Sequence, residues 1–153
     1  MPMLGPGDRV PDVGVWTAPR EEAQPLKSVL GSGLSLLCFY LYDWSPTRTN
    51  ELHLLRDRGD DLAAAGIQPF AISRDSPWSH RAWAQTLGVE IPILSDWNGE
   101  ATRAFDVAFE PLGMHDVAIR SAFLIRDGET IEATWMLGSE LPDIDAVIAA
   151  AQS

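Results

Sequence analysis

Two short apolar runs separated by one helical segment constrain the fold of this chain more than any other feature. Residues 34–41 and 67–73 are almost continuously apolar, which is typical of strands covered on both faces. Between them, residues 52–62 carry leucines at helical spacing, and Gly66 follows as a helix-ending residue. A strand, a helix and a strand in this order form a βαβ unit, which requires parallel pairing and a right-handed crossover.

The rest of the chain continues this alternation. Asp127-Gly128 joins two of the predicted strands and is a strong hairpin signal. The further elements expected, in chain order, are a strand at 13–16, a helix at 77–87, an edge strand at 91–94, a helix at 98–105, strands at 118–126 and 130–137, and a helix at 142–150. Parallel units followed by an antiparallel hairpin predict an α/β fold with a mixed central sheet flanked by helices.

Length and charge bound the kind of protein. The 153 residues predict a single domain that spans the whole chain, 1–153. A formal net charge of −11 argues against nucleic acid or an anionic membrane as a partner. The first residues lack the features of a secretory signal, and no apolar run approaches the roughly 20 residues that span a bilayer. We therefore expect a cytoplasmic location.

Cysteine and histidine usage is sparse. The single cysteine, Cys38, excludes an internal disulfide, and the three histidines lie far apart. No Cys/His cluster has the spacing of a zinc site, so we expect no metal. No glycine-rich phosphate loop is present either, and no cofactor is expected.

Five segments, in order along the chain, carry a resemblance to a known family. They are Gly7-Asp-Arg-Val-Pro-Asp12, Phe39-Tyr-x-x-Asp-Trp-Ser-Pro-x-x-Thr-x-Glu-Leu52, Ile72-Ser-x-Asp-Ser-Pro-Trp-Ser-His-Arg-Ala-Trp83, Ile91-Pro-Ile-Leu-Ser-Asp96 and Arg120-Ser-Ala-Phe-Leu-Ile125. Together they resemble the peroxiredoxins, the alkyl hydroperoxide reductase and thiol-specific antioxidant family. The third segment is similar to the one-cysteine and bacterioferritin-comigratory branches. The resemblance implies a thioredoxin-like fold and thiol-dependent peroxide reduction as an antioxidant activity.

The departure from the family falls on its chemistry. Members carry Pro-x-x-x-Thr-x-x-Cys, in which the cysteine thiolate attacks the peroxide O–O bond and the threonine helps to hold the peroxide. Here the motif is Leu41-x-x-x-Ser45-x-x-Arg48, so arginine stands at the cysteine position. The neighbouring Thr47 and Thr49 hydroxyls are no substitute for a peroxide nucleophile. The sequence therefore predicts a family scaffold without its peroxidatic cysteine.

Two supporting groups of the family site are retained. Arg120 matches the arginine that stabilises the thiolate, and Glu51 matches a glutamate that orients this arginine. The resemblance places Ser45, Arg48 and Arg120 at the active-site positions, and a ligand pocket would be lined by Trp44, Ser45, Arg48, Glu51 and Arg120. Two neighbouring guanidiniums repel unless a negative group lies between them. Either the pocket holds a carboxylate or other small anion, or Arg48 turns outward to solvent.

Three functional hypotheses follow. In the first, the chain has lost thiol peroxidase activity and acts as a binding or regulatory module, a pseudoenzyme. In the second, the same pocket performs different chemistry, for instance in specialised metabolism, with the arginines holding a carboxylate or an oxyanion. In the third, Cys38 supports residual hydroperoxide reduction, although a cysteine within an apolar strand is expected to be buried and inert.

Tryptophans and histidines complete the candidates. Trp44 lies in the active-site loop, and Trp78 and Trp83 lie near a helix start, where the family forms a common end-on dimer. A homodimer is therefore expected, with core packing as the alternative, above all for Trp83. His80 matches a structural position of the family, whereas the pair His115-Asp116 is expected in a solvated loop.

Overall fold

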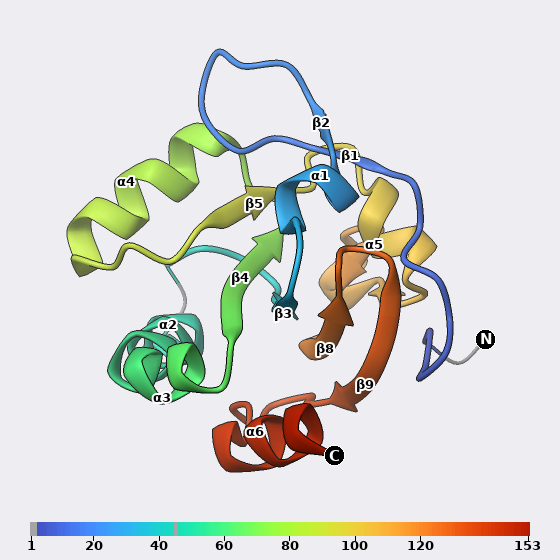
Figure 1. The fold of residues 1–153 in the computed structure, drawn as a ribbon. Coiled ribbons are helices and arrows are strands. Elements are labelled where there is room, and N and C mark those ends of the chain that lie inside the picture. The colour runs from blue at the N-terminus through green and yellow to red at the C-terminus, as the bar shows by residue number, and fades with distance from the viewer. Residues whose placement is uncertain (1–2, 45) are drawn as a thin grey trace.

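A five-stranded mixed sheet forms the centre of the protein (Figure 1). The computed structural model describes residues 3–44 and 46–153, without the side chains of residues 46–48. The strand order is β5-β4-β3-β8-β9. Their bounds are Leu34–Phe39 for β3, Ile67–Ser73 for β4, Ile93–Ser95 for β5, Ser121–Arg126 for β8 and Thr130–Met136 for β9. Strands β3, β4 and β5 are parallel, and β8 and β9 are antiparallel to their neighbours, which confirms the predicted mixed sheet.

Helices and short strands complete the chain. The helices are α1 (Leu26–Leu30), α2 (Pro46–Asp57), α3 (Gly59–Ala64), α4 (Pro77–Leu87), α5 (Glu100–Ala104), α6 (Ile144–Gln152) and the 3-10 turn η1 (Pro111–Gly113). Two small ribbons pair β1 (Gly14–Val15) with β2 (Gln24–Pro25) and β6 (Ala108–Phe109) with β7 (Val117–Ala118). None of the described helices has the length and apolarity needed to cross a membrane.

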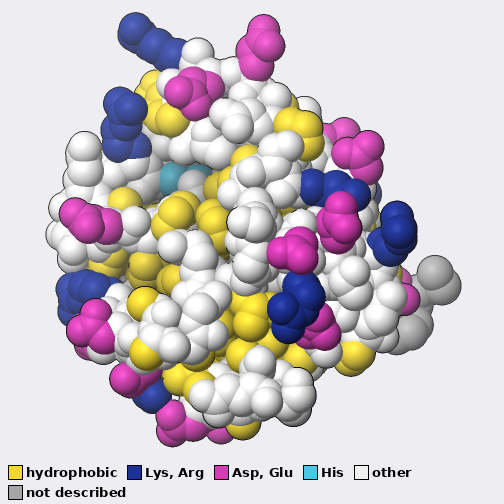
Figure 2. All heavy atoms as spheres, in the orientation of Figure 1, with side chains coloured by type: hydrophobic (Ala, Val, Ile, Leu, Met, Phe, Trp, Pro, Cys, Tyr) yellow, Lys and Arg dark blue, Asp and Glu magenta, His cyan; other side chains and the backbone are white. Residues whose placement is uncertain are grey.

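The sheet separates two apolar cores because successive side chains of a strand point to opposite faces. Leu37 and Phe39 of β3 belong to one core, which α1, α5 and the N-terminal segment cover. Leu36 and Cys38 belong to the other, which α2, α3, α4 and α6 cover. The helices therefore lie on both faces of the sheet, as the sequence predicts. On the face of the molecule shown in Figure 2, positive and negative side chains are mixed and form no concentrated basic patch.

Several local signals act as expected. Helix α4 begins where Ser76 accepts a hydrogen bond from the Ser79 N–H, and Gly88 ends it in the left-handed conformation at φ 68°. Asp127 and Gly128 both have positive φ, as a two-residue hairpin turn requires. Strand β5, next to Pro92, is an edge strand of the sheet.

The predicted helix between the first two central strands is in fact two helices. The chain leaves helical geometry at Arg58, whose φ and ψ are −96° and 12°, and Gly59 then begins α3. Glycine is a poor helix former, so a break at Gly59 costs little helix stability. Arg58 stabilises the break between α2 and α3 through ion pairs to Asp61 and Asp145, each with an N–O distance of 2.7 Å.

The predicted strand 118–126 is also divided. Residue Ala118 pairs with Ala108 in the small β6–β7 ribbon, and the central strand β8 begins only at Ser121. The Ile119 N–H donates to the Val107 carbonyl and so continues this ribbon. Arg120 consequently lies at the junction between the ribbon and the central sheet. The predicted helix at 98–105 is shorter, and the final helix begins after its cap, Asp143.

Candidate functional site

The loop that follows β3 leads to the start of α2 at the carboxyl edge of the parallel strands. Ligand sites of open α/β sheets lie at this edge. Tyr40 extends β3 by donating its N–H to the Ile72 carbonyl at 3.1 Å. The loop then turns through Trp44, which has a left-handed φ of 73° and an exposed indole. A non-glycine residue in this conformation is uncommon and indicates a constrained turn.

A buried polar cluster holds this loop against α4. The Asp43 carboxylate accepts hydrogen bonds from the Tyr40 hydroxyl at 2.5 Å and the Ser79 hydroxyl at 2.7 Å. The Nδ1–H of His80 donates to the same carboxylate at 2.8 Å. Asp43 and His80 are both buried, so this carboxylate joins β3, the loop and α4 in one network.

A second carboxylate supports the first. Asp75 accepts a hydrogen bond from the Asp43 N–H at 2.9 Å and from the Ser73 hydroxyl at 2.6 Å. Burial raises the pKa of the Asp75 carboxyl, and the nearby Asp43 charge adds to this effect. Burial also raises the pKa of the Tyr40 hydroxyl, and the negative charge of Asp43 raises it further. Asp75 and the Tyr40 hydroxyl are therefore costly to ionise, and their hydrogen bonds are used within the fold.

Arg120 and Glu51 lie close enough for their charges to interact. Their exposed fractions are 5% and 1%, so both ionisable groups are buried. Desolvation lowers the pKa of Arg120, and the Glu51 charge acts in the opposite direction, as expected for neighbouring opposite charges. The Arg120 Nη1 donates to the Glu140 carbonyl at 3.2 Å. Its Nε has no hydrogen-bond partner in the part of the chain that the structure describes.

The predicted pocket is therefore only partly described. The charge of Glu51 acts on Arg120, and Trp44 lies in the loop before α2; that these three residues line one ligand pocket stays a prediction. Ser45 lies outside the described residues, and so does the side chain of Arg48, although its backbone belongs to α2. The contributions of Ser45 and Arg48 to the pocket stay predictions. Among the described residues, no group of acidic, histidine or cysteine side chains is arranged to hold a metal ion.

Cys38 lies in the middle of β3, between Ala71 of β4 and Ala122 of β8. Its side chain is fully buried in the apolar core that α2 and α6 cover. Burial raises the pKa of the Cys38 thiol well above its usual value, and the charge of Glu51 raises it further. The prediction that Cys38 is a core residue is confirmed.

The remaining candidates divide into core and surface. Trp83 is buried in the core with an exposed fraction of 1%, whereas Trp44 and Trp78 are exposed. His80 is structural, as the sequence predicts. His115 lies in an exposed loop and contacts Glu110 at 2.8 Å, which agrees with the predicted solvated role.

Sequence reasoning missed the cluster around Asp43. Asp43 and Asp75 are not among the candidate residues of the sequence, and no pattern links His80 to either. Asp43 and His80 are 37 positions apart, so no short motif joins them. The only available signal is that each lies directly after a strand or at a helix start on the same sheet edge.

The family comparison matches most of the chain. The model of the AhpC/TSA family covers residues 6–134. Peroxiredoxin 2 of Thermoplasma acidophilum is 29% identical over 158 aligned positions, which cover 95% of this chain and 75% of the relative. Thioredoxin peroxidase of Echinococcus granulosus is 32% identical over 99 positions, which cover 60% of this chain and only half of that protein.

Solved structures share the same fold. Peroxidoxin BcpB of Mycobacterium tuberculosis aligns with a TM-score of 0.84 at 22% identity, over 97% of both chains. Reduced Prx3 of Vibrio vulnificus, in complex with hydrogen peroxide, aligns with a TM-score of 0.87 at 17% identity, over 98% of this chain and 97% of that one. These alignments confirm the predicted thioredoxin-like fold.

Proposed function

Since this chain is a member of the AhpC/TSA family, which contains the peroxiredoxins, we propose that it retains the family scaffold without thiol peroxidase activity. It acts instead as a binding or regulatory module with a small anion-accepting pocket. The pocket comprises Glu51 and Arg120, with Trp44, Ser45 and Arg48 contributing from the loop and the first turn of α2. The fold is common to active relatives, so the proposal depends on the site residues.

The position of the single cysteine carries the proposal. Thiol peroxidase chemistry needs an accessible thiolate, because the thiolate is the nucleophile. Cys38 is buried in the central strand β3, and its pKa is raised. The family position for the nucleophile, at the start of α2, is occupied by Arg48. Neither location supplies the group that the reaction requires.

The chemistry of Arg120 supports an anion as the ligand. A buried guanidinium is costly unless opposite charge and hydrogen-bond acceptors surround it. Glu51 and the Glu140 carbonyl meet part of this requirement. The Nε is buried and has no partner in the described residues, so Arg120 needs one more acceptor than these residues supply. A small carboxylate, phosphate or sulfate is suited to this geometry.

The described acids and histidine do not favour the alternative of a new enzyme in the same pocket. A general base must reach the proton that it removes. Asp43 and His80 use each other as partners in a buried cluster, and the His80 Nε2 is enclosed. These groups support the loop rather than a reacting atom.

Peroxide consumption tests the loss of activity. The purified chain is mixed with hydrogen peroxide or cumene hydroperoxide and dithiothreitol, with the Thermoplasma acidophilum peroxiredoxin 2 as the comparison enzyme. We expect the rate for this chain to equal that of the buffer, and Cys38→Ser to change nothing. Turnover by the wild-type chain that Cys38→Ser abolishes would overturn the proposal.

Thermal unfolding tests the pocket. A ligand that binds only the folded state at 100 times its Kd stabilises by about 2.7 kcal/mol. For a chain of this size, such stabilisation raises Tm by roughly 5 to 10 °C. We expect sulfate or acetate to raise Tm above chloride at equal ionic strength, and Arg120→Gln to remove the difference. Arg126→Gln is the control, because Arg126 is exposed and lies at the far end of the adjoining strand β8; loss of the shift in both variants would contradict a specific site.

We also propose a homodimer formed through the exposed Trp44. Aromatic side chains are enriched at the centres of protein interfaces. Light scattering at high protein concentration should give twice the chain mass, and Trp44→Ala should reduce it. A monomer at millimolar concentration would contradict the dimer.

A further inference from the structure

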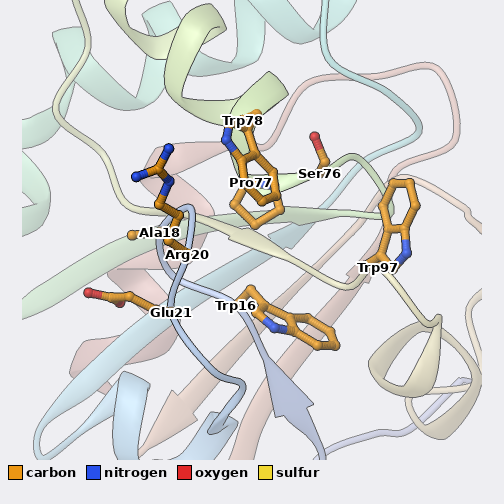
Figure 3. A pocket seen from close by; sticks show the side chains of 8 residues that line it. All are labelled: Trp16, Ala18, Arg20, Glu21, Ser76, Pro77, Trp78 and Trp97. Carbon is orange, nitrogen blue, oxygen red and sulfur yellow. The ribbon is translucent and has the colours of Figure 1, made fainter.

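A second pocket lies beside the start of α4 and shares no residue with the site around Arg120. It has a volume of about 520 Å³ and is lined by three tryptophans, Trp16, Trp78 and Trp97 (Figure 3). Small-molecule sites are commonly clefts of roughly 300–1,000 Å³ with mainly apolar and aromatic walls. The size and lining of this pocket therefore fit a small molecule with an aromatic ring.

Three loops, distant in sequence, supply the walls. Trp16 follows β1, Trp78 lies in the first turn of α4, and Trp97 follows β5. In Figure 3 the indoles of Trp16 and Trp78 lie on opposite sides, with Trp97 at one end and Arg20 at the other. The loops after β4 and β5 leave the carboxyl edge of the parallel strands, where α/β sheets bind ligands.

Backbone hydrogen bonds fix the walls in place. Trp16 and Ser95 exchange two of them, with N–O distances of 3.0 and 2.8 Å. The Trp97 carbonyl accepts from the Arg74 Nε at 3.2 Å and Nη2 at 3.1 Å. Trp78 follows the N-cap of α4. The site is thus formed before any ligand binds, which limits the entropy lost on binding.

The indoles of the pocket are available for contact. Trp78 and Trp97 have exposed fractions of 59% and 56%, and Trp16 is half-buried. The close aromatic pairs found in the described residues involve other rings, of Phe39, Tyr40, His80, Trp83, Phe105 and Phe123. Large exposed aromatic groups around one hollow typically mark an interaction site. Their faces favour stacking with a planar ring.

A positive charge lies at one end of the pocket. Arg20 has no ion pair or side-chain hydrogen bond in the described part of the chain. Its backbone has a left-handed φ of 68°, a conformation that costs roughly 1–2 kcal/mol for a side chain of this kind. Such strain is often kept where it positions a functional group. In Figure 3 the guanidinium lies on the Trp78 side of the pocket.

The neighbouring acid does not cancel this charge inside the pocket. The Glu21 carboxylate points away from the indoles in Figure 3 and accepts a hydrogen bond from the Thr17 hydroxyl at 3.1 Å. A chain with a net charge of −11 therefore presents a guanidinium to an aromatic hollow. This combination favours an anion over an organic cation, because a planar guanidinium pairs well with a carboxylate.

We propose that this pocket binds a planar aromatic carboxylate. The ring lies among Trp16, Trp78 and Trp97, and the carboxylate pairs with Arg20. The site is separate from the proposed anion pocket of Arg120, and either can exist without the other.

Isothermal titration calorimetry with three naphthalene probes of one shape tests the charge preference. They are 2-naphthoate, neutral 2-naphthylmethanol and cationic 2-naphthylmethylammonium. We expect 2-naphthoate to bind with about three- to tenfold higher affinity than the alcohol, because an exposed charge pair contributes modestly. The cation should bind weakest.

Matched variants assign the contacts. Arg20→Gln should lower the affinity for 2-naphthoate about three- to tenfold and leave the affinity for the alcohol unchanged. Arg9→Gln is the control, because Arg9 is exposed and also has no ion pair in the described chain. Trp97→Ala should weaken both probes about threefold or more through lost stacking. Trp97 is largely exposed, so this variant is expected to stay folded, which circular dichroism checks.

Three results would overturn the proposal. Equal affinity for all three probes would remove the role of Arg20, and preference for the cation would make the site an aromatic cage. Absence of heat with 2-naphthoate, together with a dimer that Trp97→Ala dissociates in light scattering, would assign the pocket to contact between two copies of the chain.

Discussion

The two sites at the carboxyl edge of the sheet differ in whether their side chains are bound to other groups of the chain. Around Asp43, polar groups are buried and bound by one another. Around Trp16, Trp78 and Trp97, large side chains face a hollow and contact few partners within the chain. The first arrangement maintains a loop and a helix start, whereas the second leaves surface for another molecule. Burial distinguishes the side chains that support this loop and helix from the indoles that are free to contact a ligand better than residue type does.

Tryptophan substitutions give the largest expected difference between the two kinds of environment. Trp83→Ala removes a fully packed ring and should lower the free energy of unfolding by about 3–5 kcal/mol. Trp97→Ala should change it by less than about 0.5 kcal/mol, as is usual for surface positions. Urea unfolding monitored by circular dichroism measures both values. Similar losses in the two variants would mean that the indole of Trp97 is packed.

Removing the central carboxylate of the buried cluster should be nearly as damaging. Asp43→Ala leaves the Tyr40 hydroxyl, the Ser79 hydroxyl and the His80 Nδ1–H without their acceptor. We expect a loss of about 3 kcal/mol, because each buried unsatisfied group costs about 1–3 kcal/mol. Asp12→Ala, at an exposed position, is the control for urea unfolding. Equal stability of the two variants would show that the cluster contributes little.

Gly99 connects stability with the tryptophan pocket. It has a φ of 76°, and a Cβ there would lie 2.8 Å from the Arg103 Nη1 and 3.0 Å from the Arg74 Nη1. Gly99→Ala should cost about 1–2 kcal/mol. It should also weaken 2-naphthoate binding, because Arg74 holds the Trp97 carbonyl.

The matched control for this variant is Gly88→Ala. Gly88 has a similar φ of 68°, but a Cβ there would meet nothing within 4 Å. We expect a comparable loss of stability and unchanged binding. If both variants bind 2-naphthoate like the wild type, Arg74 does not position Trp97.

The smallest expected effect concerns pH. The folded-state pKa of Asp75 is raised, so the folded chain binds more protons than the unfolded chain near this pKa. The contribution of Asp75 to stability is therefore greatest below its unfolded pKa of about 3.9 and falls as pH rises through the folded pKa. Urea unfolding at several values between pH 4 and 7 should show Asp75→Asn gaining stability relative to wild type as pH rises. A constant difference would contradict the raised pKa.

Much of the fold could be predicted from local patterns. The apolar runs at β3 and β4, the capping residues Ser76 and Gly88 and the turn at Asp127-Gly128 all form the predicted elements. Each of these signals acts over a few neighbouring residues, so the sequence order is enough to read it. The failures have another origin: Arg58 at the helix break pairs with the distant Asp145, and the division before Ser121 follows from the pairing of Ala118 with Ala108.

The candidate site was predictable only in part. The motif around Arg48 and the match at Arg120 identified the family position and the missing cysteine, because these residues lie in segments that resemble the family. The Asp43–His80 contact and the pocket of Trp16, Trp78 and Trp97 had no such motif. Their members lie on separate loops, and only the packing of those loops makes them neighbours.

The sequence by itself determined the order of strands and helices, the apolar burial of Cys38 and the replacement of the family nucleophile by Arg48, because these depend on residue type and on spacing within one element. The tertiary structure alone decided that Asp43 binds His80 and that Arg20 lines one pocket with three tryptophans. The reason is that parallel strands place their carboxyl ends at one edge of the sheet, and the loops that meet there come from distant parts of the chain.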